Sequence, residues 1–181
     1  MVLIIVLIII FLVYTLPFKT FKDTTEENTL WGMNDPDNIY LTFDDGPNPE
    51  VTPFLLDELK KSGNKATFFI IPEYIPTNEE IVRRVYNEGH TIGLHGKSRF
   101  LASNSKDYLA EYIASFERNM SKILNESFRT KYFRPPSGWR SQQLYDVLKE
   151  KNIILIGWSE FCWLDSYISS QTAVKNRFEK H

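Results

Sequence analysis

The feature that most constrains the fold is a regular alternation of short apolar runs with segments of helical periodicity. Runs typical of strands cover residues 39–43, 66–71, 91–94, 131–133 and 153–158. Segments whose apolar residues recur every three or four positions follow them, and these predicted helices begin near residues 48, 78, 105, 141 and 169. Strands joined by helices pair in parallel, so the pattern predicts an α/β fold with a parallel sheet.

The composition is that of one folded domain. The chain has 181 residues, of which 43% are hydrophobic and 24% charged, and this is enough to bury a sizeable core. Its net charge is −2 and it contains no long basic run, so nucleic acid is not expected as a partner. Cys162 is the single cysteine, which excludes an intrachain disulfide and every multi-cysteine zinc site.

The N-terminus is a segment of a different kind. The first sixteen residues are almost wholly apolar, and with the next two they approach the length needed to span a bilayer. We therefore expect residues 1–18 to be a hydrophobic membrane anchor or signal segment, residues 19–37 a linker, and residues 38–181 the folded domain. The domain should then be membrane-anchored or secreted and extracytoplasmic, although the two lysines after the segment favour a cytosolic placement under the positive-inside rule.

Two adjacent carboxylates stand out at the predicted end of the first strand. Asp44 and Asp45 lie in residues 42–47, which read TFDDGP. Neighbouring carboxylates repel each other unless a cation or a shared proton relieves the repulsion, so this pair marks a candidate site. A surface turn is the alternative, because Asp-Gly and Gly-Pro pairs are common in turns.

Other polar residues also follow predicted strands. His95 comes after the third strand, Arg134 after the fourth, and Asp165 beyond the fifth. In a (β/α) barrel the carboxyl ends of the strands form the active face. An Asp and a His gathered there could hold a divalent metal such as zinc, and a second carboxylate could act as general base toward a metal-bound water. Structural roles are the alternative, namely an ordinary surface or core histidine and an arginine that anchors a turn.

Several segments resemble the motifs of the polysaccharide deacetylases with a NodB-type homology domain, carbohydrate esterase family 4. They are residues 42–47, 66–69, 88–95 and 133–138, with a looser likeness over 158–165. The resemblance implies a distorted (β/α) barrel of the polysaccharide deacetylase type. It also implies a hydrolase of carbon–nitrogen, non-peptide bonds that removes N-acetyl groups from chitin-like or peptidoglycan-like polysaccharide or oligosaccharide with the help of a metal.

The resemblance further implies roles for individual residues. Asp44 would be the catalytic base, Arg134 would orient it, and Asp165 would tune a catalytic histidine. Asp45 and His95 would bind a divalent metal, for which we expect zinc, with cobalt or another ion as alternatives. Substrate contacts are expected after the fourth strand and at the end of the fifth, at Pro136, Ser137, Gly138, Trp139 and Trp158.

The sequence departs from the family pattern in two places. The second metal-binding histidine, four residues after His95, is replaced by Arg99, and a guanidinium has no lone pair to offer a metal. The chain also ends at His181, before the family's last strand and its Leu-x-His motif. We therefore expect a barrel that lacks its last strand or strands.

These departures leave two alternatives to an active deacetylase. One is a catalytically inactive pseudoenzyme that binds carbohydrate, in which Arg99 takes the place of the cation and pairs with Asp45. The other is a truncated fragment of a longer active enzyme. The Ser137-Gly138-Trp139 variant resembles a divergent branch of the family in which the second histidine is also often changed.

Overall fold

The described part of the chain is built on one parallel sheet. The structure is a computed structural model that describes residues 28–32, 35 and 37–158. Its strands are β1 (Thr29–Leu30), β2 (Thr42–Gly46), β3 (Thr67–Ile70), β4 (Thr91–His95), β5 (Tyr132–Arg134) and β6 (Ile154–Ile156). They pair in parallel in the order β1-β6-β5-β4-β3-β2. The predicted α/β fold with a parallel sheet is confirmed.

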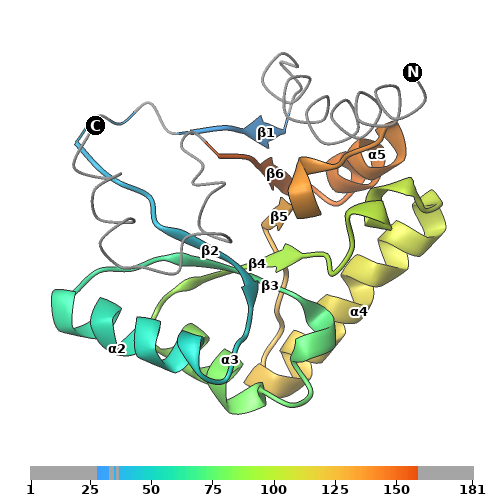
Figure 1. The fold of residues 1–181 in the computed structure, drawn as a ribbon. Coiled ribbons are helices and arrows are strands. Elements are labelled where there is room, and N and C mark those ends of the chain that lie inside the picture. Colours follow the sequence, from blue (N-terminus) through green and yellow to red (C-terminus); the bar gives the residue numbers. More distant parts are fainter. Residues whose placement is uncertain (1–27, 33–34, 36, 159–181) are drawn as a thin grey trace, which may run out of the picture.

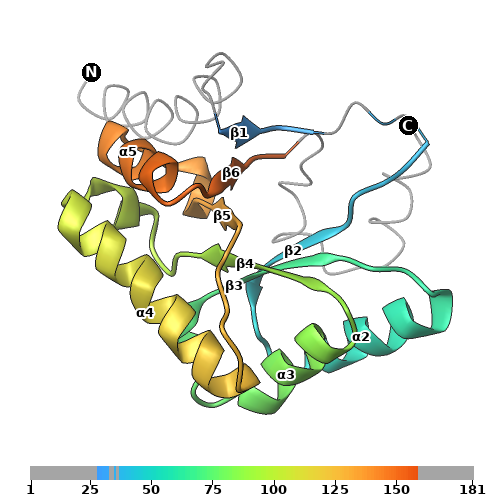
Figure 2. The same ribbon diagram turned by 180° about the vertical axis from the view of Figure 1, so that it is seen from behind.

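Helices connect the strands from β2 to β6. They are α2 (Val51–Ser62), α3 (Glu79–Asn87), α4 (Lys106–Leu124) and α5 (Gln142–Glu150), with 3₁₀ turns η1 (Pro72–Tyr74), η2 (Arg99–Ser103) and η3 (Pro136–Gly138). Figures 1 and 2 show α2 and α3 beneath β2, β3 and β4, α4 running past β4 and β5, and α5 beside β6. Consecutive helices from α2 to α5 pack against one another, and strands β2 to β6 are neighbours in the sheet in sequence order.

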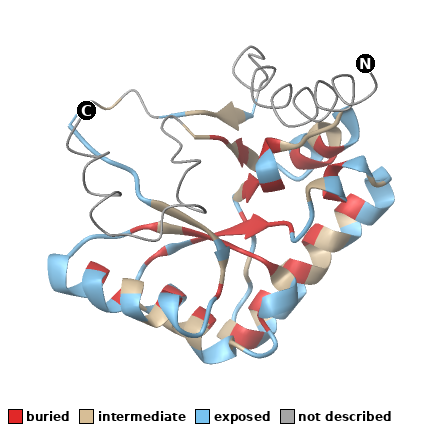
Figure 3. Cartoon of the chain, in the orientation of Figure 1, coloured by how far each residue is buried: buried red, intermediate tan, exposed pale blue. Residues whose placement is uncertain are grey.

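The core lies between the sheet and the inner faces of these helices (Figure 3). The apolar stripe of α4 is buried as its spacing predicts, through Leu109, Ile113, Phe116, Met120 and Ile123. One glycine is needed for the packing of the sheet. A Cβ on Gly93 would lie 2.6 Å from the Phe69 ring, so the absence of a side chain lets that ring lie across β4.

The predicted helix boundaries hold well because their capping residues are local signals. The hydroxyls of Ser105 and Ser141 accept hydrogen bonds from the first turns of α4 and α5. Gly63 ends α2 in the left-handed conformation, with φ of 72°. Asn78 precedes α3 as predicted, but its side chain donates to the Tyr74 carbonyl at 2.8 Å and makes no cap.

The first predicted strand is displaced along the chain. It was expected at residues 39–43, whereas β2 covers residues 42–46, and Ile39 is 90% exposed. Pairing with β3 begins at Thr42 and Thr67. Of the apolar run before β2, the Leu41 carbonyl accepts from the Thr67 N–H at 2.9 Å. Asp44 lies inside a strand and not after one. The register of β2 shifts between Phe43 and Gly46, which places a bulge at the two carboxylates.

A linker is expected over residues 19–37, and the part of that range that the structure describes includes β1, which pairs with β6. The Leu30 carbonyl accepts from the Gly157 N–H at 2.8 Å, and the ring of Trp31 lies so close to Gly157 that a Cβ there would meet it at 2.2 Å. Two strand residues carry no periodic pattern, and they join the sheet through their backbone alone.

Several predictions concern residues outside the described ranges. These are the hydrophobic segment 1–18 and the helix near residue 169. Over the residues that are described, no helix is long and apolar enough to cross a membrane. In the same part of the chain β1 and β2 stand at opposite edges of the sheet.

The buried His90 predicts how stability changes with pH. Its side chain is 1% exposed, and its Nδ1 accepts a hydrogen bond from the Ala66 N–H at 3.2 Å. Burial lowers the pKa of His90 in the folded protein. Below the ordinary histidine pKa of about 6.5, the unfolded chain therefore binds a proton at this residue more readily than the folded protein does. We expect the free energy of unfolding to fall as the pH drops from 7 toward 5, as measured by urea titration.

The variant His90→Gln removes this titration and should flatten the pH dependence in that range, although its absolute stability will be lower. An unchanged slope between pH 7 and pH 5 in the variant would contradict the assignment.

Candidate active site

A buried ion pair joins β2 to β5. The guanidinium of Arg134 donates from Nη1 to Asp44 Oδ1 at 2.9 Å and to Thr42 Oγ1 at 2.8 Å. Its Nη2 donates to the Gly157 carbonyl at 2.9 Å. The side chain of Arg134 is 2% exposed and that of Asp44 is 23% exposed. Charge-assisted bonds of this kind fix direction as well as charge, so Asp44 is held in one orientation at the edge of the site.

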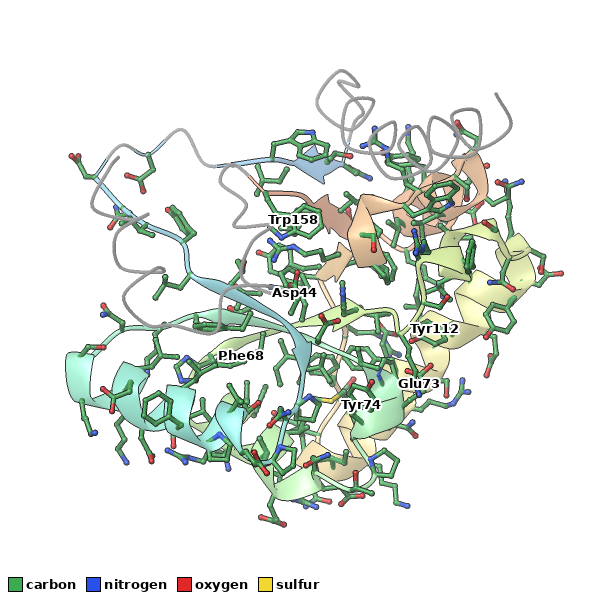
Figure 4. The ribbon with its side chains drawn as sticks, viewed as in Figure 1. Asp44, Phe68, Glu73, Tyr74, Tyr112 and Trp158 are labelled. Atoms are coloured by element: carbon green, nitrogen blue, oxygen red, sulfur yellow. The ribbon has the colours of Figure 1, made fainter. Side chains whose placement is uncertain are left out.

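Two aromatic rings enclose the same guanidinium. Its carbon lies 4.2 Å from the centre of the Phe69 ring and 4.9 Å from that of Trp158. Burial lowers the pKa of Arg134, while the Asp44 carboxylate acts to raise it. An arginine keeps its proton under such conditions, so Asp44 faces a permanent positive charge. Figure 4 shows Trp158 and Asp44 near each other around this centre.

The second carboxylate meets a different partner. Oδ1 of Asp45 lies 3.4 Å from Nε2 of His95. The other ring nitrogen of His95, Nδ1, is 2.6 Å from the main-chain carbonyl oxygen of Arg134. A carbonyl can only accept, so Nδ1 carries a proton and donates it. In the neutral imidazole, Nε2 then presents its lone pair to Asp45.

Two lone pairs that face each other at this distance need a positive charge between them. A second proton on His95 or a metal ion would supply it, and the hydrogen bond to His95 lowers the pKa of Asp45. Because Asp45 is 78% exposed and adopts φ of 63°, its carboxylate is open to solvent and to ligands. An imidazole nitrogen with its other nitrogen donating to a carbonyl is the usual arrangement of a metal ligand.

The donor set fits a divalent metal in part. Zinc is bound by imidazole nitrogen and carboxylate oxygen, and catalytic zinc sites commonly have three protein ligands. Asp45 and His95 would provide two of them. Over the described residues, no group of three His, Cys, Asp or Glu side chains is arranged to hold a metal.

Arg99 does not take the place of the missing ligand. It begins η2, and its guanidinium carbon lies 5.7 Å from the centre of the Phe100 ring. No ion pair joins Arg99 to Asp45, whose carboxylate contacts His95 instead. The pairing expected for an inactive form is therefore not present between these two described residues.

Comparison with known proteins decides the family. Residues 32–155 match the family described as polysaccharide deacetylase. The chain belongs to the polysaccharide deacetylase family. This membership confirms the resemblance found in the sequence motifs.

Individual polysaccharide deacetylases show how far the likeness extends. A peptidoglycan-N-acetylglucosamine deacetylase of Bacillus cereus is 37% identical over 122 residues, which make up 67% of this chain and 44% of the relative. A crystal structure of a peptidoglycan N-acetylglucosamine deacetylase is 34% identical, with a TM-score of 0.65, and the match covers 72% of this chain and 61% of that one.

A further solved structure is a family 4 acetyl xylan esterase from Clostridium thermocellum in complex with a cobalt ion. It is 33% identical to this chain, with a TM-score of 0.58, and the match covers 65% of this chain and 56% of that one. This chain thus spans about half the length of several proteins that it matches.

The residues expected to contact substrate are placed unequally by the deacetylase fold. Pro136 and Gly138 are buried in η3, whereas Ser137 is exposed at a left-handed position with φ of 53°. Trp139 packs partly against the core cluster, and Trp158 stacks on the guanidinium of the ion pair. Only Ser137 of this set is classed as exposed. Asp165 lies outside the described residues.

Three contacts of Arg134 were missed by sequence reasoning. Phe69 and Thr42 belong to segments that the family motifs had singled out, so the resemblance could have indicated them. The Gly157 carbonyl carries no signal in the sequence, because any residue has a carbonyl. Its position depends on the end of β6 and its pairing with β1.

Removing Arg134 should be far more damaging than removing a surface arginine. Arg134→Met leaves Asp44 partly buried and unpaired, and we expect the free energy of unfolding to fall by about 3–5 kcal/mol. The control is Arg129→Met, because Arg129 is 71% exposed and pairs with Glu117 at 3.5 Å; it should cost less than about 1 kcal/mol. If chemical denaturation gave equal decreases in the free energy of unfolding for the two variants, the buried ion pair would contribute no more to stability than the surface pair.

Proposed function

We propose that this domain is a metal-dependent hydrolase that removes N-acetyl groups from a peptidoglycan-like or chitin-like polymer. The observation that carries the proposal is the division of the two carboxylates between two partners. Asp44 is fixed by Arg134 at 2.9 Å, and Asp45 lies 3.4 Å from His95. One carboxylate is thereby available as a base and the other as a metal ligand, as hydrolysis of an amide requires.

Asp44 acts as the general base in this proposal. The described hydrogen bonds occupy its Oδ1, so Oδ2 takes a proton from the attacking water. The water oxygen forms a bond to the acetamide carbonyl carbon, the carbon–nitrogen bond breaks, and acetate and an amine are the products. Protonated Asp44 carries the proton that the leaving amine needs. Arg134 keeps the carboxylate aimed throughout, as a positioning residue.

Asp45 and His95 would hold the divalent metal, with zinc expected and cobalt as an alternative. When bound, the metal supplies Lewis-acid polarisation of the acetamide carbonyl. The geometry of buried His95 supports this role. Its Nδ1 is fixed by the Arg134 carbonyl at 2.6 Å, so its Nε2 is available to bind the metal. The family resemblance gives Asp165 a role only beside a catalytic histidine, and no residue of this sequence is assigned that part.

The location follows from the substrate. A polymer of the cell wall lies outside the cytoplasm, so we propose an extracytoplasmic domain that residues 1–18 anchor in the membrane or direct to secretion. The almost wholly apolar character of the first sixteen residues supports this proposal.

A second candidate function is carbohydrate binding without turnover. The observation that favours it is Arg99, which stands where a second histidine ligand is expected. With two ligands instead of three, the metal would be held weakly or not at all. Metal content separates the two candidates directly.

The deciding experiment measures metal content and acetate release together. We expect the purified domain, supplied with zinc or cobalt, to release acetate from chitooligosaccharides or peptidoglycan fragments. Asp44→Asn should lower the rate by about 10²- to 10⁴-fold while keeping the metal, and His95→Ala should lose the metal. The surface variant Asp57→Asn on α2 is the control and should keep both properties.

Arg99→His offers a test in the opposite direction. By supplying a third ligand it should tighten metal binding, measured by competition with a chelator, and raise the rate of acetate release. No acetate from any of these substrates with metal present, in the wild type and in Arg99→His, would contradict the proposed hydrolase and favour the binding function.

A further inference from the structure

A pocket of about 240 Å³ lies between η1, η2 and the first half of α4. Six of the residues that line it are Glu73, Lys97, Phe100, Asn104, Tyr108 and Tyr112. They come from η1, η2, α4 and the loop residues that flank η2, and they mix aromatic rings with one acidic and one basic group. Figure 4 shows Glu73 and Tyr112 gathered together with Tyr74 at this place.

Two of the three aromatic residues of the pocket are exposed. Phe100 is 64% exposed and Tyr108 is 52% exposed. Tyr108 stacks on Tyr112, with 6.4 Å between the ring centres and 16° between the planes. Accessible apolar rings that gather at a hollow are typical of a surface that receives a ligand. A flat ring face packs well against another flat, weakly polar face.

The polar groups are arranged as an acceptor and a donor. The Tyr112 hydroxyl donates to Glu73 Oε2 at 3.2 Å, and burial followed by the Glu73 charge raises the pKa of Tyr112. Tyr112 therefore stays protonated, and Glu73 keeps further lone pairs for a ligand. The Lys97 ammonium lies 5.4 Å from the centre of the Tyr74 ring. No ion pair joins Lys97 to Glu73 in the described structure, so neither side chain neutralises the charge of the other.

The position of the pocket ties it to the proposed site. Lys97 lies two residues after His95, and two residues of chain span at most about 7 Å. Glu73 follows β3, while His95 ends β4, the neighbouring strand. The pocket therefore opens at the same carboxyl edge of the sheet as the ion pair.

We propose that this pocket is a subsite for a further sugar ring of the polymer. The apolar face of a pyranose would pack on Tyr108 and Phe100, its hydroxyl protons would be accepted by Glu73, and its oxygens would accept from Lys97. A phosphate would be repelled by Glu73, and a purely apolar ligand would leave both charges without partners. That the ring is an N-acetylated sugar rests on the proposed function, while the pocket's affinity for a sugar does not depend on turnover.

The test measures the affinity for N-acetylglucosamine and its tetramer by calorimetry, in the absence of turnover. The wild type should bind the tetramer more tightly than the monosaccharide. Tyr108→Ala and Glu73→Gln should each reduce that gain by roughly fivefold to tenfold. The matched control is Phe54→Ala, because Phe54 is an aromatic residue of α2 that is 61% exposed; it should keep the whole gain. Circular dichroism confirms that the variants are folded.

Two outcomes overturn the subsite: a tetramer affinity that is unchanged in folded Tyr108→Ala and Glu73→Gln, or a wild type that gains nothing from the longer chain. Tetramer binding that depends on both residues, without acetate release, would uphold the subsite and contradict only the proposed hydrolase. In an active enzyme, the same variants should raise KM for the tetramer and leave kcat near its wild-type value.

Discussion

The site depends on one buried charge, the guanidinium of Arg134. Burying an ion is unfavourable unless its donors and its charge are satisfied. Here a carboxylate, a hydroxyl and a carbonyl accept from Nη1 and Nη2, and two rings cover its faces. Nε is buried without a partner among the described residues. The same residue also fixes His95 through its main-chain carbonyl, so one position orients both the proposed base and the proposed metal ligand.

The two adjacent carboxylates illustrate how a local bulge resolves an electrostatic problem. Successive strand residues point to opposite faces, and Asp45 adopts a left-handed backbone conformation where the register of β2 shifts. Asp44 turns inward, where it is 23% exposed, and Asp45 turns outward, where it is 78% exposed. Each carboxylate thus has its own partner, and neither has to share a proton with the other.

Much of this arrangement could be predicted from the sequence, and the remainder could not for physical reasons. Strand and helix order, the helix ends at Ser105 and Ser141, and the buried stripe of α4 follow from local patterns. The start of β2 was misplaced because an apolar run at residues 39–41 is exposed, and hydrophobicity alone does not show which residues find a partner strand. The aromatic cover of Arg134 depends on packing between segments far apart in the chain.

The pairing of β1 with β6 has a consequence for the extent of the functional unit. Gly157 donates its N–H to the Leu30 carbonyl, and its own carbonyl accepts from Arg134. One residue, through its two backbone groups, therefore links the edge strand β1 to the buried guanidinium of Arg134. The stretch that matches the family begins at residue 32, two residues after Leu30. The residues that support the proposed active site therefore include β1, which lies before the first residue of the family match.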